Sequence, residues 1–137
     1  MSTQSLRTAG IILVVFPTVV FGGASLLWHW ITRQSAYYDH PLRRALWRAG
    51  HAHAGVLLLL ALACLVLVDQ ADLPAGWQHV VRTTVPAAAI LVPAGFFLSI
   101  AKPDADRPNA LVNLAYAGGV AVALGTVTLG VGLLRAA

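Results

Sequence analysis

Four long apolar segments, separated by short polar stretches, constrain the fold of this chain more than any other feature. They are Ile11–Ile31, Gly50–Val68, Val80–Ala101 and Leu111–Leu134. A helix needs about 20 mostly apolar residues to cross the hydrocarbon core of a bilayer, and each segment is close to that length. Backbone polar groups must be satisfied internally in lipid, which helices achieve. The pattern therefore predicts an all-α integral membrane four-helix bundle in a single domain.

The composition agrees with a protein embedded in a lipid bilayer. Of the 137 residues 58% are apolar and 10% are charged, whereas soluble domains are about 25% charged. The mean hydropathy is +0.76. The net charge of +4 does not indicate a nucleic-acid partner, because the basic residues lie beside apolar spans and form no basic face. A single cysteine, Cys64, excludes an internal disulfide and is expected to pack as a small apolar residue.

The distribution of Lys and Arg predicts how the chain is oriented in the membrane. The first segment is longer than the apolar region of a signal peptide, about 7–15 residues, so we expect it to be a retained span. One side of the membrane then holds Arg33, Arg43, Arg44, Arg48, Lys102 and Arg107. The other side holds Arg7, Arg82 and Arg135. The positive-inside rule makes the first side cytoplasmic, so both termini are expected outside, in a bacterial inner membrane.

Two histidines, His51 and His53, lie at the start of the second apolar segment, in the run Arg48-Ala-Gly-His-Ala-His-Ala-Gly55. An ionisable side chain at that depth is costly and is by default a functional hypothesis. Residues two apart on a helix are turned by about 200°, so the two rings are expected on opposite faces and cannot grip one metal side by side. We expect at least one to hold an iron or copper centre, with Gly55 leaving room for a flat macrocycle. The alternative is a structural or interfacial role.

The other polar side chains near the spans are weaker candidates for chemistry. His29, His40 and His79 are expected at the interface, with His29 the best further ligand because the first segment ends on the same side as His51. Glutamate is absent, which argues against a carboxylate-bridged di-iron site. Six aromatic residues are expected to anchor the bundle at headgroup level: Trp28, Trp30, Tyr37, Tyr38, Trp47 and Trp77.

The fourth segment carries both polar and small residues that need partners. Asn109, Asn113 and Tyr116 are spaced by four and three, which predicts one helical face at the membrane level of the histidines. They are expected either to form interhelical hydrogen bonds or to build a polar pocket beside the histidines. Small residues let helices approach closely, so a tight partner is expected within the chain or in a second subunit. The glycines concerned are Gly118, Gly119, Gly125, Gly130 and Gly132.

Two short motifs resemble those of a known family. The stretch Ala52-His-Ala-Gly55, at the start of the second span of a small four-span chain, resembles styrene oxide isomerase. Gly95-Phe96-Phe97-Leu98 is similar to that family's Gly-Phe-Tyr-Leu, near the end of the third helix. The family's Trp-x-Arg-Ala-His-Ser-Gly motif supplies the axial histidine of a haem b that lies between the subunits of a trimer. The resemblance therefore implies a homotrimer with His53 as the iron ligand.

The resemblance also implies an activity. In these enzymes ferric haem acts as a Lewis acid on an epoxide, which rearranges to a carbonyl compound (the Meinwald rearrangement), so a small apolar substrate such as an aryl epoxide is expected. Phe97 and Leu59 replace the family's tyrosine and asparagine, which orient the substrate. The residues expected at the substrate are Tyr116, Asn113 and Phe97. Those expected at the cofactor are His53, His51, Arg48 and Gly55.

Two further functions fit the same residues. The first is electron transfer or redox or gas sensing through haem, which requires a second axial ligand such as His29 or His51. The second is an accessory membrane subunit without a cofactor, in which the glycine-rich fourth helix packs against a larger partner and the histidines only form hydrogen bonds.

Overall fold

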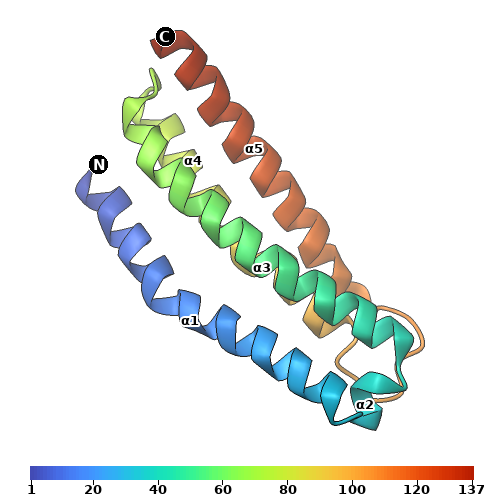
Figure 1. Ribbon diagram of the computed structural model, residues 1–137. Coiled ribbons are helices and arrows are strands. Elements are labelled where there is room, and N and C mark those ends of the chain that lie inside the picture. Colours follow the sequence, from blue (N-terminus) through green and yellow to red (C-terminus); the bar gives the residue numbers. More distant parts are fainter.

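A computed structural model describes residues 1–137 and contains helices only (Figure 1). The long helices are α1 (Thr3–Ile31), α3 (Pro41–Leu67), α4 (Ala75–Ser99) and α5 (Asn113–Ala136). Each belongs to a segment long and apolar enough to cross a membrane. The connections contain a short helix, α2 (Ser35–Tyr38), and two 3₁₀ turns, η1 (Val68–Gln70) and η2 (Ala110–Val112). The all-helical architecture with four candidate membrane spans is confirmed.

The second long helix begins earlier than the hydropathy pattern predicts. We expected a loop up to Ala49, whereas α3 begins at Pro41. Proline suits the first turn of a helix because its missing N–H would be unpaired there. His40 caps this end, since its Nδ1 accepts a hydrogen bond from the backbone N–H of Arg43 at 3.3 Å. Arg43, Arg44 and Arg48 are therefore helical residues and do not belong to a loop.

Both chain termini lie at the same end of the bundle, together with the turn between α3 and α4 (Figure 1). The opposite end carries α2 and the connection from α4 to α5. The central pair is α3 and α4, with α5 packed along α4 and α1 along α3. Only Ser5 and Ile12 are buried in α1, so this helix is peripheral. The start of α3, the end of α4 and the start of α5 thus meet at one end, as predicted.

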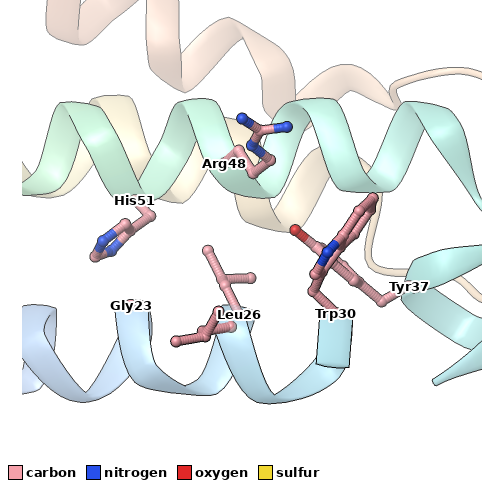
Figure 2. A pocket seen from close by; sticks show the side chains of 7 residues that line it. Gly23, Leu26, Trp30, Tyr37, Arg48 and His51 are labelled. Atoms are coloured by element: carbon pink, nitrogen blue, oxygen red, sulfur yellow. The ribbon is translucent and has the colours of Figure 1, made fainter. Parts of the chain in front are cut away.

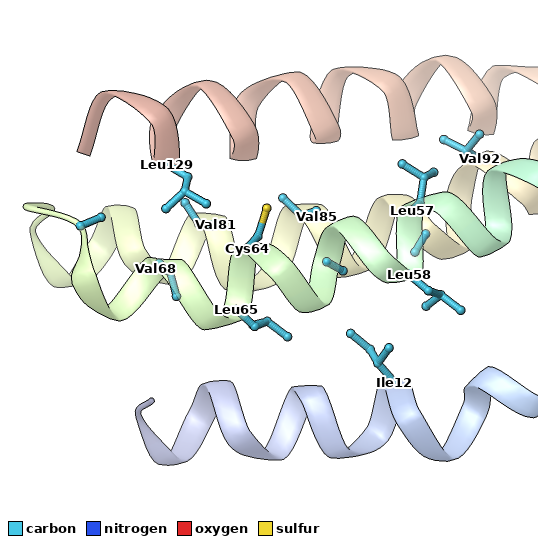
Figure 3. Close-up of a cluster of buried hydrophobic side chains, with 13 residues drawn as sticks. Ile12, Leu57, Leu58, Cys64, Leu65, Val68, Val81, Val85, Val92 and Leu129 are labelled. Atoms are coloured by element: carbon cyan, nitrogen blue, oxygen red, sulfur yellow. The ribbon is translucent and has the colours of Figure 1, made fainter. Parts of the chain in front are cut away.

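The apolar core fills the space between α3 and α4 (Figure 3). Its most buried members include Leu65, Val68, Val81 and Val85. Cys64 belongs to this cluster and is buried, as expected of a small apolar residue. Ile12 of α1 and Leu129 of α5 reach the same cluster, so one continuous core connects all four helices.

The glycine-rich helix α5 has its close partner within the chain. Gly118, Gly125 and Gly132 lie against α4 and the turn before it: a Cβ there would collide with Val92, Val85 and Leu73 respectively. From α4, a Cβ on Gly95 would collide with the backbone of Ala115. Gly119 and Gly130 have no neighbour within 4 Å of an added Cβ, so they leave the other side of α5 open.

At each end of the bundle a buried arginine connects neighbouring segments of the chain through hydrogen bonds. Arg82, 8% exposed, donates hydrogen bonds to Asp69 Oδ1 at 2.5 Å, Gln78 Oε1 at 2.9 Å and Ser5 Oγ at 3.0 Å. At the other end Arg43, 3% exposed, donates to the carbonyl oxygens of Ala36 and Lys102, both at 2.5 Å, and of Ile100 at 3.4 Å. Arg82 therefore lies within α4, paired with a carboxylate, and is not a loop cation.

Candidate functional site

His53 presents one ring nitrogen to the outside of the bundle. Its Nδ1 lies 2.7 Å from the carbonyl oxygen of Ala49, one turn earlier in α3. Only a protonated Nδ1 can donate to that carbonyl, so a neutral His53 ring with this contact carries its lone pair on Nε2. A hydrogen bond from one ring nitrogen to a backbone carbonyl is the usual way in which proteins orient a metal-binding histidine. The His53 side chain is thus prepared to act as a ligand through Nε2.

The cavity beside His53 lies on the face formed by α3, α4 and α5. Its volume is about 510 Å³. It is mostly apolar, and the ring of Phe96 lies 5.2 Å from that of His53, centroid to centroid. Tyr116 is 71% exposed, and its hydroxyl has no hydrogen-bond partner in the chain. The lining residues are His53, Leu57, Val92, Phe96, Val112, Ala115, Tyr116, Gly119 and Val122.

His51 lies on the other face of α3, toward α1 (Figure 2). A Cβ on Gly23 would come within 2.9 Å of the His51 Nε2 atom, so the ring lies directly against the α1 backbone. Two cavities meet at this ring. The outer one, about 470 Å³, is lined by Gly23, Leu26, Leu27, Trp30, Tyr37, Arg48 and His51. The inner one, about 220 Å³, is lined by Phe21, Gly22, Ser25, Leu26, Trp47, His51 and Phe97.

The expected site residues therefore separate into two groups. His53 and Tyr116 share the cavity on the α4–α5 side. Arg48 and Phe97 lie with His51 on the α1 side, and the nearest neighbour of a Cβ on Gly55 would be Val19 of α1, at 3.8 Å. The prediction that the two histidines face opposite ways is confirmed, whereas Phe97, expected at the substrate with Tyr116, lines a different cavity.

The polar face expected in the fourth span is only partly formed. Asn109 precedes α5 and caps η2: its side-chain oxygen accepts from the Leu111 N–H at 2.8 Å and its amide donates to the Leu98 carbonyl at 3.1 Å. The spacing predicted that Asn109 shares a helical face with Tyr116, and this prediction is wrong because Asn109 lies before the helix. Asn113 is exposed at the first turn of α5 and has no partner in the chain.

The histidine, cysteine and carboxylate side chains of the chain suit a haem better than a bare metal ion. No group of three or more His, Cys, Asp or Glu side chains converges on a common point, so a bare metal ion finds no protein cage. A haem needs only an axial ligand from the protein, because the macrocycle supplies the equatorial nitrogens. His29 is held among aromatic rings, with its Nδ1 2.7 Å from the Ser25 carbonyl oxygen and Tyr37 and Trp47 at its edges.

Sequence reasoning missed two features of these sites. Trp47 was expected to be an interfacial anchor, yet its indole Nε1 is buried without a hydrogen-bond partner, in a side chain that lines the inner cavity. Both Phe96 and Phe97 were expected to line one pocket, but only Phe96 lies beside His53, and Phe97 lines the other cavity. Two adjacent phenylalanines on a helix point to different faces, but only the rotation of α4 decides which of them meets His53.

No family model, curated protein or solved structure matches the chain.

Proposed function

We propose that this chain is an integral membrane haem b protein that holds its iron through His53. The single observation that carries the proposal is the hydrogen bond from His53 Nδ1 to the Ala49 carbonyl, which leaves Nε2 free beside an apolar cavity. The axial ligand and the polarity around the iron are the means by which a protein tunes haem. Apolar side chains such as Leu57 and Val92 supply a low-polarity wall.

The walls of the cavity suit a flat, apolar occupant. Phe96 offers an aromatic face beside His53, and Gly119 leaves the α5 backbone uncovered. His53 and Tyr116 are both exposed, so an occupant would be covered on its outer side by lipid or by a second copy of the chain. We propose a homo-oligomer, a trimer by resemblance, in which the cofactor lies between subunits.

For the reaction we propose the isomerisation of a small apolar epoxide, such as an aryl epoxide, to a carbonyl compound. Ferric haem supplies a Lewis acid for the epoxide oxygen. The chain's own residues would bind the apolar part of the substrate through Phe96 and Leu57 and keep water away from the opened ring. The unpartnered hydroxyl of Tyr116 can donate a hydrogen bond to the substrate oxygen. Asn113 lies farther out, at the start of α5, and Phe97 takes no part because it lines the other cavity.

The cavity favours this proposal over electron transfer. A six-coordinate haem requires a second axial side chain, and the lining offers no histidine, methionine or cysteine besides His53. His51 projects from the opposite face of α3, and His29 is packed against Trp47. Within one chain, His53 would therefore be the only imidazole to hold the iron.

A UV–visible spectrum of the detergent-purified protein, ferric and then dithionite-reduced, tests the proposal. We expect a Soret band that shifts when carbon monoxide or imidazole is added. Low-spin bands indifferent to both ligands would favour electron transfer. The absence of any Soret band, even with haem supplied during expression, would overturn the proposal and leave an accessory subunit without a cofactor as the better account.

We also propose that the protein lies in a bacterial inner membrane with both termini outside. The end that carries α2 holds six Lys or Arg residues and the terminal end holds three, one of which, Arg82, is paired with Asp69. A cysteine placed at Ala137 in a Cys64→Ala background should react with a membrane-impermeant maleimide on intact spheroplasts. Labelling only after lysis would reverse the orientation.

A further inference from the structure

The cleft between α1 and α3 is a second candidate site, separate from the His53 cavity. Its outer part is lined by the charged side chain of Arg48 and by the rings of Trp30 and Tyr37 (Figure 2). Arg48 forms no ion pair. The single ion pair of the structure joins Arg82 and Asp69 at the other end of the bundle. The mouth of the cleft therefore carries an unneutralised positive charge at the level where α3 enters the membrane.

The inner part of the cleft is apolar and has Trp47 in its wall. Phe21, Phe97 and Leu26 line it, together with Trp47, whose buried indole N–H has no acceptor. A buried donor without a partner costs about 1–3 kcal/mol, and such groups in native proteins call for an explanation. Because that nitrogen has almost no accessible surface, a ligand in the cavity would contact the apolar face of the indole ring and not its N–H.

Gly23, with Gly22 beside it, makes room for the His51 ring against α1. A Cβ on Gly22 would lie 3.6 Å from His51 Nδ1, and one on Gly23 would lie 2.9 Å from His51 Nε2. The imidazole therefore occupies space that any larger residue on α1 would need. It has no hydrogen-bond partner in the chain, unlike His53. Arg48 and His51 thus bring two polar side chains without a partner in the chain to the wall of the outer cavity.

We infer that this cleft binds an apolar carboxylate: a single-chain amphiphile whose head meets Arg48 at the mouth of the cleft and whose chain extends past His51. Arg48 can hold a carboxylate by paired, charge-assisted hydrogen bonds, which are the strong ones. The depth fits, since a charged head remains near the interface while its chain extends into the apolar region. The inner cavity, about 220 Å³, favours one chain over two. His53 projects from the other face of α3, so a haem bound through it would occupy a different cavity from this ligand.

Fluorescence quenching by a brominated fatty acid tests this inference. The full chain, with Trp28→Phe and Trp77→Phe, retains Trp30 and Trp47 as emitters at the cleft; both replaced side chains are exposed. In nanodiscs of saturated phosphatidylcholine, 9,10-dibromostearate should quench with saturation, at about tenfold lower concentration than its methyl ester, which has no charge to meet Arg48. Equal quenching by acid and ester would overturn the inference.

Matched variants connect the quenching to the cleft. Arg48→Gln should weaken binding of dibromostearate about tenfold, whereas Arg33→Gln, which removes a charge stacked on Tyr38 outside the cleft, should not. The reverse order would place the ligand elsewhere. If butyrate displaced the probe at equal concentration, the apolar chain would play no part and an amphiphile would be excluded. His53→Ala should still bind dibromostearate, because His53 lines the other cavity. A negative result of the quenching experiment would therefore not contradict the haem proposal.

Discussion

His51 and His53 are two residues apart on α3 and lie in separate cavities, His51 against Gly23 of α1 and His53 beside Phe96 of α4. A helix turns by about 100° per residue, so neighbours at this spacing serve different surroundings. One helix thereby carries two sites, and substitutions at the two histidines should have separable effects.

The first prediction concerns haem retention. His53→Ala removes the only imidazole of the α4–α5 cavity and should abolish haem binding, measured as the ratio of Soret to protein absorbance. His51→Ala, two residues away, is the matched control and should weaken haem retention at most. Exogenous imidazole should restore part of the Soret band to His53→Ala. Full haem occupancy in that variant would show that the ligand assignment is wrong.

The second prediction concerns Tyr116. If its hydroxyl donates to the substrate oxygen, Tyr116→Phe should lower kcat for isomerisation of an aryl epoxide by about tenfold to a hundredfold, the effect of one lost hydrogen bond. The Soret band should not change, since the ring remains. Tyr38→Phe, in α2, serves as control and should retain full activity. An unchanged kcat in Tyr116→Phe would remove this residue from the mechanism.

The third prediction concerns the crossing of α4 and α5. A Cβ on Gly95 would collide with the backbone of Ala115, which cannot move aside as a flexible side chain can. Gly95→Ala should therefore destabilise the protein by about 1–3 kcal/mol, seen as a lower melting temperature in detergent. Gly130→Ala, with open space around it, should be neutral or stabilising because alanine favours helix. Equal melting temperatures would contradict this close packing.

The fourth prediction concerns the partly buried ion pair of Asp69 and Arg82 at the terminal end. Asp69→Asn leaves the guanidinium of Arg82, 8% exposed, without its carboxylate. Arg82 keeps its hydrogen bonds to Ser5 and Gln78, so the loss of the carboxylate should cost about 1–3 kcal/mol and lower the melting temperature. Asp72→Asn, at an exposed carboxylate nearby, should have little effect. A double variant, Asp69→Asn with Arg82→Met, should recover part of the loss; if it recovered none, the unpaired charge would not be the cause.

Some of the site geometry could be predicted from local pattern alone. The number of spans follows from the length of apolar runs, and the opposite directions of His51 and His53 follow from helical periodicity. The early start of α3 depended on capping: Pro41 and His40 hold a helix over residues that hydropathy assigns to a loop. The place of Asn109 was missed for a similar reason, because its side chain caps η2 instead of continuing the face of Tyr116.

What the sequence by itself determined is the secondary structure and the class of protein, because backbone hydrogen bonding in lipid leaves long apolar runs few alternatives to the helix. What only the tertiary structure decided is which face of each helix meets which neighbour. Hydropathy does not state how α4 is rotated, and that rotation puts Phe96 beside His53 and Phe97 beside Trp47. Glycine contacts between distant residues, such as Gly95 with Ala115, set that rotation, and they follow from packing in three dimensions.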